Sequence, residues 1–100
     1  MIKHIVMWKL YDSAGGFSKE QNARRIKQGL ESLKTKINEI KSLEVGINFN
    51  PSPAAFDVVL YSEFLTREDL LIYQDHPEHT KFKEMINSLR SDRTVVDYEI

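Results

Sequence analysis

The strands that this sequence predicts are apolar on both faces, and no other feature constrains the fold as strongly. Residues 2–10 alternate from one face to the other, as is typical of a strand. His4 and Val6 fall on one face and Ile5 on the other. A strand with one face in water carries polar residues there. Here the second face is apolar in three strands: Ile5, Met7, Val59, Tyr61, Val96 and Tyr98. Both faces of the sheet must therefore be covered.

Extended and helical periodicities follow one another along the chain in the order βαββαβ. Further strands are predicted over residues 43–49, 56–64 and 94–100. A capping box of Ser18 and Gln21 predicts the start of a long helix. Its apolar stripe is Ala23, Ile26, Leu30, Leu33, Ile37 and Ile40. A second helical region begins at Thr66 and is interrupted before Pro77, because proline disfavours a helical residue in front of it.

This order predicts one α+β domain over residues 1–100, with a four-stranded antiparallel sheet. The handedness of βαβ crossovers puts both helical regions on one face of the sheet. The other apolar face then needs a different cover. A second copy of the chain is the economical one, because a two-fold axis lets one apolar sheet face meet itself. The sequence therefore predicts a homodimer.

The charge balance argues against nucleic acid and membrane partners. The chain has 14 Lys and Arg against 15 Asp and Glu, so no strong field attracts it to a polyanion. It has no cysteine, which excludes disulfides and thiol catalysis. The N-terminal residues contain no apolar run long enough for a signal peptide or a membrane span. We expect a cytoplasmic protein that contacts neither nucleic acid nor membrane.

Chemistry is expected first at residues 73–79, which hold a tyrosine and two of the three histidines. Pro77 suits the first position of a new helix, and it pushes His76 into an extended conformation. His79 then lies one turn into the helix, where a neutral imidazole can donate or accept a proton near neutral pH. The phenol of Tyr73 is its candidate hydrogen-bond partner. The alternative is that His76 caps the helix and His79 only lies on its surface.

A pocket between the sheet and the helices would add the third histidine. His4 lies on the strand face that the helices are expected to cover, so it would lie under Tyr73 and His79. These three residues are the candidate catalytic groups. Asp97 falls on the neighbouring strand, where its carboxylate can fix the tautomer of His4. The candidate ligand-binding residues are Val6, Trp8, Leu60, Phe82, Leu89 and Asp97. The alternative is an Asp97–His4 pair that serves stability alone.

Metal and cofactor sites are not expected. His76 and His79 have a spacing that suits a metal within a helix, but His76 precedes Pro77 and lies outside the helix. Asp75 and Glu78 could at most hold a hard cation loosely. The sequence has no Gly-rich phosphate loop, Ser-His-Asp triad or cofactor fingerprint.

Three segments together resemble the stress-responsive dimeric α/β-barrel (Dabb) family: residues 2–10, 73–79 and 96–98. The resemblance covers essentially the whole chain and implies a ferredoxin-like monomer whose sheet meets that of its mate in a barrel. Similar plant members cyclise linear polyketides by an intramolecular aldol condensation without a metal or organic cofactor. In those members a tyrosine and a histidine act together, and the matching positions are Tyr73 and His79. His4 matches a further pocket histidine, whereas Val58 stands where the cyclising members have another one.

Two function classes follow from these observations. The first is a small enzyme or binding protein for a largely apolar carbonyl compound, acting as a cofactor-independent cyclase or lyase. The second is a non-catalytic stress-response or interaction protein, in which the polar residues only cap and cross-link the fold.

Overall fold

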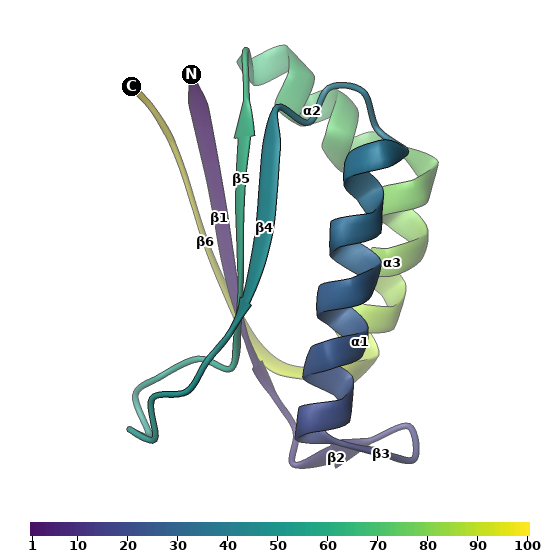
Figure 1. Ribbon diagram of the computed structural model, residues 1–100, viewed down its shortest axis with the longest axis vertical. Helices are drawn as coiled ribbons and strands as arrows, with labels where there is room; N and C mark the ends of the chain where they lie inside the picture. Colours follow the sequence, from purple (N-terminus) through teal and green to yellow (C-terminus); the bar gives the residue numbers. More distant parts are fainter.

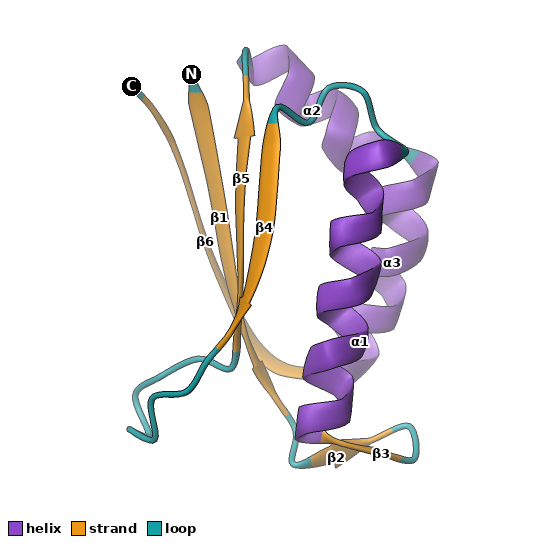
Figure 2. Cartoon of the chain, viewed as in Figure 1, coloured by secondary structure: helices purple, strands orange, loops and turns teal.

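A four-stranded antiparallel sheet forms one layer of the molecule, and three helices form the other (Figures 1 and 2). The computed structural model describes residues 1–100. In spatial order the strands are β4 (Ser42–Ile47), β5 (Val58–Phe64), β1 (Ile2–Leu10) and β6 (Arg90–Glu99). Each strand pairs antiparallel with its neighbours. The fold is therefore α+β and ferredoxin-like, as the sequence predicts.

The alternation of β1 separates a buried face from an open one. Val6 pairs with Leu60 of β5 and with Val95 of β6, so the three side chains share one face of the sheet. Val6 and Leu60 are buried under the helices, whereas Met7 on the opposite face is 36 % exposed. The predicted assignment of the two faces is confirmed.

The helices are α1 (Lys19–Ser32), α2 (Arg67–Asp75) and α3 (Pro77–Leu89), all on the same side of the sheet in Figure 1. The predicted capping box is present, because Ser18 and Gln21 bind each other's backbone amides. Thr66 caps α2, and Pro77 is the first residue of α3. None of the three helices combines the length and apolar content needed to cross a bilayer.

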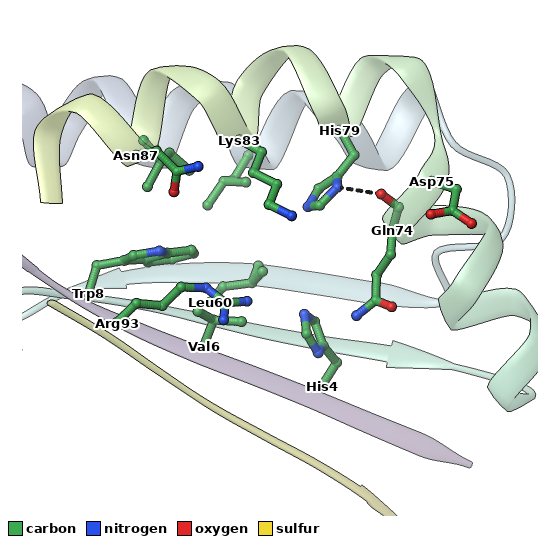
Figure 3. A pocket seen from close by; sticks show the side chains of 12 residues that line it. His4, Val6, Trp8, Leu60, Gln74, Asp75, His79, Lys83, Asn87 and Arg93 are labelled. Atoms are coloured by element: carbon green, nitrogen blue, oxygen red, sulfur yellow. Dashed lines mark hydrogen bonds between the residues drawn. The ribbon is translucent and has the colours of Figure 1, made fainter.

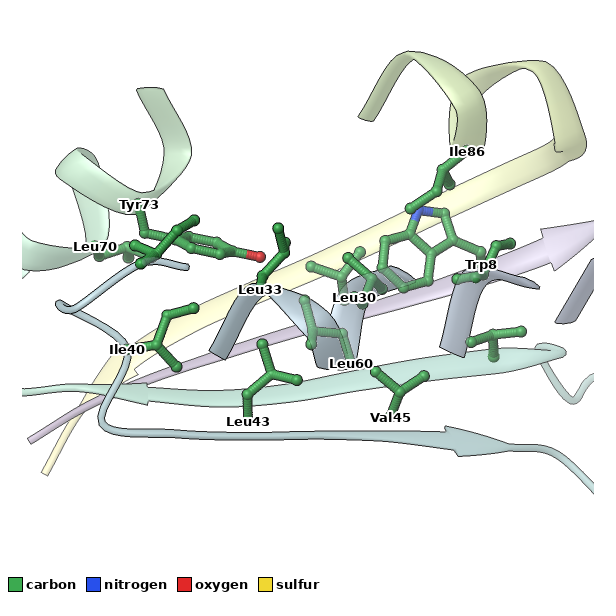
Figure 4. Packing of buried hydrophobic residues seen from close by; sticks show 14 of the residues in the cluster. Trp8, Leu30, Leu33, Ile40, Leu43, Val45, Leu60, Leu70, Tyr73 and Ile86 are labelled. Carbon is green, nitrogen blue, oxygen red and sulfur yellow. The ribbon is translucent and has the colours of Figure 1, made fainter. Parts of the chain in front are cut away.

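The core is one cluster of 19 buried apolar residues between the helices and the sheet. Figure 4 shows Trp8 from β1 between Leu30 of α1 and Ile86 of α3, with Tyr73 of α2 at the other end of the same layer. A close approach between helices contributes to this packing. A Cβ atom added at Gly29 of α1 would meet the ring of Phe82 at 1.7 Å.

The long helix is shorter than its apolar stripe predicts. It ends at Ser32, and a single 3₁₀ turn follows at Leu33–Thr35. The hydroxyl of Ser32 donates to the carbonyl of Gly29, which favours a tighter turn at the helix end. Ile37 and Ile40 are buried as expected, but they belong to the turn that leads into β4.

The strand predicted over residues 43–49 ends two residues early in the structure, so the prediction is wrong at its C-terminal end. Strand β4 ends at Ile47, and Phe49 is 98 % exposed. The side chain of Asn48 accepts from the amide of Asn50 and donates to its carbonyl, which turns the chain out of the sheet. The loop that follows projects from the side of the sheet opposite the helices (Figure 1).

Two further differences lie at strand ends. Gly15 and Gly16 both have positive φ angles, and they join two short strands, β2 (Ser13–Ala14) and β3 (Phe17–Ser18), into a hairpin. Strand β6 begins at Arg90, earlier than the predicted start at residue 94, directly after the last residue of α3. The helix and the edge strand are thus joined without a loop.

Candidate functional site

A pocket of about 300 Å³ lies between the buried face of the sheet and helix α3 (Figure 3). Its apolar lining residues are Val6, Trp8, Leu30, Leu60 and Ile86. Its polar lining residues are His4, Gln74, Asp75, His79, Lys83, Asn87 and Arg93. The pocket is therefore apolar over part of its wall and carries several titratable groups.

The start of α3 places His79 in this pocket. His76 is extended, and its Nδ1 accepts a hydrogen bond from the amide of Glu78 at 3.1 Å, so His76 caps the helix as the alternative interpretation proposes. One turn further, the ring of His79 points toward the sheet (Figure 3). His79 does not lie only on the outer surface of the helix, because it lines the pocket.

A backbone carbonyl fixes the tautomer of His79. Its Nδ1 lies 3.1 Å from the carbonyl oxygen of Gln74. A carbonyl only accepts, so Nδ1 carries the proton and Nε2 keeps a free lone pair. Burial is the main cause that lowers the pKa of His79, and the positive charges of Lys83, His4 and Arg93 lower it further. The hydrogen bond to Gln74 acts in the opposite direction. The imidazole is therefore neutral near pH 7, the state in which Nε2 can take up a proton.

His4 is fixed in a similar way by a carboxylate. It lies opposite Asp97 in the register of β1 and β6, and its Nδ1 pairs with Oδ1 of Asp97. The predicted pairing of these two residues is confirmed. The carboxylate accepts a hydrogen bond from Nδ1–H, which leaves Nε2 of His4 as the ring nitrogen available to a ligand.

Tyr73 lies behind the two histidines rather than in the pocket wall. It is fully buried, its ring centroid is 4.5 Å from that of His79, and the corresponding distance to His4 is 6.1 Å. The expected hydrogen bond between Tyr73 and His79 is absent, because the two rings pack against each other instead. The hydroxyl has no partner, and burial raises the pKa of the phenol, which stays protonated.

The other candidate ligand-binding residues divide into two groups. Val6, Trp8 and Leu60 line the pocket, as expected. Phe82, Leu89 and Asp97 do not. Phe82 and Leu89 belong to the packing of the core. Asp97 reaches the pocket only through His4.

Five polar lining residues are not among the predicted catalytic or ligand-binding residues: Gln74, Asp75, Lys83, Asn87 and Arg93. The sequence carries a signal for the last three. Lys83 and Asn87 follow His79 at intervals of four residues, the spacing of one helix face. Arg93 is four residues before Asp97, so the two share a strand face. No group of three or more His, Asp or Glu side chains is arranged as metal ligands.

Comparisons with known proteins identify the family of the chain. The sequence model of the stress responsive A/B barrel domain matches residues 2–100. The chain is 25 % identical to the stress-response A/B barrel domain-containing protein DABB1 of Arabidopsis thaliana over 107 aligned residues. That alignment covers 98 % of this chain but 46 % of the plant protein, so the chain spans about half the length of this relative.

Solved structures show the same fold. A dimeric protein of unknown function with a ferredoxin-like fold from Bacteroides fragilis is 35 % identical, with a TM-score of 0.85 over 99 % of this chain and 95 % of that one. The hydroxynitrile lyase of Passiflora edulis is 21 % identical, with a TM-score of 0.82 over 99 % of this chain and 92 % of the lyase. The match of this family model over residues 2–100 shows that the chain belongs to the stress-responsive A/B barrel domain family.

Proposed function

We propose that the pocket binds a small, largely apolar carbonyl compound and moves a proton on it without a cofactor, as a cyclase or lyase does. One observation carries this proposal. Two histidines, His4 and His79, line the same pocket, and each is held at Nδ1 by an acceptor. Both Nε2 atoms are then available to a ligand whose body contacts the apolar wall.

His79 is assigned the role of general base. Its Nε2 takes a proton from the carbon next to the ligand's carbonyl, and the electron pair of that C–H bond moves to form an enolate. The lowered pKa of His79 favours the neutral, proton-accepting imidazole at pH 7. The enolate carbon can then attack a second carbonyl of the same molecule, with the proton returned to the new alkoxide.

Tyr73 is assigned the stabilisation of the enolate oxygen. Its hydroxyl has no partner within the chain and stays protonated, so it is a donor without a competing acceptor. This role requires the ligand's oxygen to approach Tyr73 between His4 and His79, because Tyr73 contributes nothing to the pocket wall. Val58 stands where the cyclising family members have a histidine, and it is buried and pairs with Trp8 across β1 and β5. Because this histidine is missing, the proposal does not name polyketides as the substrate.

The test is turnover of β-keto thioesters and linear β-polyketides, together with deuterium exchange into benzylacetone followed by NMR. His79→Ala is expected to slow proton transfer by about 10²-fold. His76→Asn is the matched control, since it removes a histidine outside the pocket and keeps a side chain that caps α3. Equal rates for His79→Ala and the unmodified chain would favour the non-catalytic function.

We further propose that the chain forms a homodimer through the open face of its sheet. Val96 and Tyr98 on this face are 50 % and 44 % exposed, and they continue the apolar surface of Ile5 and Met7. The similar protein from Bacteroides fragilis is dimeric. An exposed apolar surface of this extent is typical of an interface.

Sedimentation at micromolar concentration tests the dimer. Val59→Lys places a charge at the centre of the open face and should give a monomer. Gln28→Lys adds the same charge on an exposed position of α1 and should leave the dimer intact. A monomeric unmodified chain would contradict the proposal.

The cytoplasmic location and the lack of nucleic acid partners are proposed from the sequence alone. Cell fractionation of a tagged chain and a shift assay with mixed DNA and RNA test them.

A further inference from the structure

Two cationic side chains enter the pocket from different walls without an acidic partner. Lys83 comes from α3 and Arg93 from β6, and both line the pocket (Figure 3). Neither side chain forms an ion pair or a hydrogen bond within the chain. By contrast Lys81, two residues earlier on the same helix, pairs with Glu78. The charges of Lys83 and Arg93 are thus free for a ligand.

Acidic groups do not neutralise this part of the pocket. Asp75 is the one acidic residue of the lining, and Figure 3 shows it at the far end, beyond His79 as seen from Lys83. Asp97 lies outside the lining and is paired with His4. The middle of the pocket therefore carries an excess of positive charge, which attracts anions.

The electrostatic effect of the two cations reaches the candidate base. The charges of Lys83 and Arg93 both lower the pKa of His79, so both interact electrostatically with its ring. A ligand anion bound between them would lie next to the group that takes up the proton. The lining thus places an anion site, an apolar wall and an imidazole within one small pocket.

We propose that the ligand is a small organic acid whose carboxylate is held between Lys83 and Arg93. The guanidinium can bind a carboxylate through two parallel hydrogen bonds, and the ammonium adds a point charge. The apolar body of the acid would lie on Trp8 and Leu60, and the pocket volume of about 300 Å³ limits it to a small one. This inference rests on the proposed function and names its substrate class as oxo acids, which carry a carbonyl and a carboxylate.

Phenylpropionate and phenylpropionamide are suitable probes, because they have nearly the same shape and differ in charge. Trp8 is the only tryptophan and lines the pocket, so its fluorescence reports on occupancy. The acid is expected to bind at least about tenfold more tightly than the amide, as charge-assisted hydrogen bonds require. Lys83→Gln and Arg93→Gln should each weaken binding of the acid by about tenfold and leave binding of the amide nearly unchanged.

Lys81→Gln is the matched control, since it removes one positive charge from the same helix at a position outside the lining. It should bind both probes like the unmodified chain. Circular dichroism of all variants verifies that they fold, which is expected because Lys83 and Arg93 are exposed. Added salt should weaken binding of the acid more than that of the amide.

The outcomes separate this inference from the proposed function. Equal binding of acid and amide, insensitive to Lys83→Gln and Arg93→Gln, would overturn the anion site and leave a pocket for neutral carbonyl compounds. Equal losses of acid binding in Lys81→Gln and Lys83→Gln would also overturn it, because the effect would then be one of net charge. If neither the acid nor the amide binds, both the anion site and the proposed function of the pocket are overturned.

Discussion

The contact between Gly29 and Phe82 yields a quantitative prediction about stability. A Cβ at Gly29 would lie 1.7 Å from Cζ and 1.8 Å from Cε2 of Phe82, whereas real Cβ atoms essentially never approach within 3.0 Å. Gly29→Ala therefore forces the ring out of its place between α1 and α3. Phe82 is half-buried and packs against the core, so the ring, and not the backbone, is expected to move.

The magnitude follows from two opposing contributions. Alanine is favoured over glycine by about 0.8–1 kcal/mol inside a helix. A fully buried Phe side chain contributes about 1.5–3 kcal/mol, so displacing a half-buried one costs about 1–1.5 kcal/mol. The two nearly cancel, and Gly29→Ala should leave the free energy of unfolding unchanged or lower it by up to about 0.7 kcal/mol.

The assay is urea unfolding followed by the fluorescence of Trp8, at one fixed protein concentration because a dimer adds to the apparent stability. Gln28 is exposed on the same helix and provides the reference. The difference between Gln28→Ala and Gln28→Gly gives the intrinsic preference for alanine in this part of α1, expected to be about 1 kcal/mol.

The Phe82→Ala background isolates the contact. Without the ring, Gly29→Ala should stabilise the protein by the amount measured at position 28, so the cycle has a coupling energy of about 1–1.5 kcal/mol. If Gly29→Ala already stabilised the unmodified protein by that amount, the close approach of the helices would be refuted.

Three further predictions concern a cap, a buried hydroxyl and a titration. Ser18→Ala removes one half of the capping box and should lower the free energy of unfolding by about 1 kcal/mol in the same urea assay, whereas an unchanged midpoint would contradict the role of the cap. Tyr73→Phe removes a buried hydroxyl without a partner, so stability should stay equal or rise by up to about 1 kcal/mol, while turnover falls if the phenol stabilises the enolate. The pKa of His79 is lower in the folded protein than in the unfolded chain, so the unfolded chain binds more protons and stability falls as the pH drops below about 6.5. His79→Gln should therefore flatten the dependence of Tm on pH below neutrality, and His76→Asn should retain the steeper profile.

The sheet and the position of its polar residues could be predicted because strand periodicity is strict. Once β1 and β6 are neighbours, a period of two determines that His4 and Asp97 share a face, and a slip of one residue would expose the whole core face. The break at Pro77 could also be predicted, since proline restricts both itself and the residue before it.

What could not be predicted depends on packing between elements. The apolar spacing of α1 continues in the sequence to Ile37 and Ile40, which lie beyond the end of the helix. These residues are apolar because they are buried, and burial does not require a helix. The phenol of Tyr73 was expected to reach His79, yet the direction of a buried ring is set by its neighbours rather than by its sequence position. Periodicity places Lys83 on the helix face of His79, but whether this face lines a pocket depends on the distance between α3 and the sheet, which periodicity does not contain.

The pairing of β1 with β6 has a consequence for the order in which the molecule folds. It joins the first and last parts of the chain, and His4 and Asp97 are separated by 93 positions. Closing so long a loop is slow, and on a ribosome β6, one of the two strands that pair with β1, emerges after every other strand of the sheet. The hydrogen bond that orients His4 therefore forms only after the remainder of the sheet can assemble. Until then one edge of β1 has unpaired backbone N–H and C=O groups. In a nascent chain this edge is open to chaperones or to another copy of the chain.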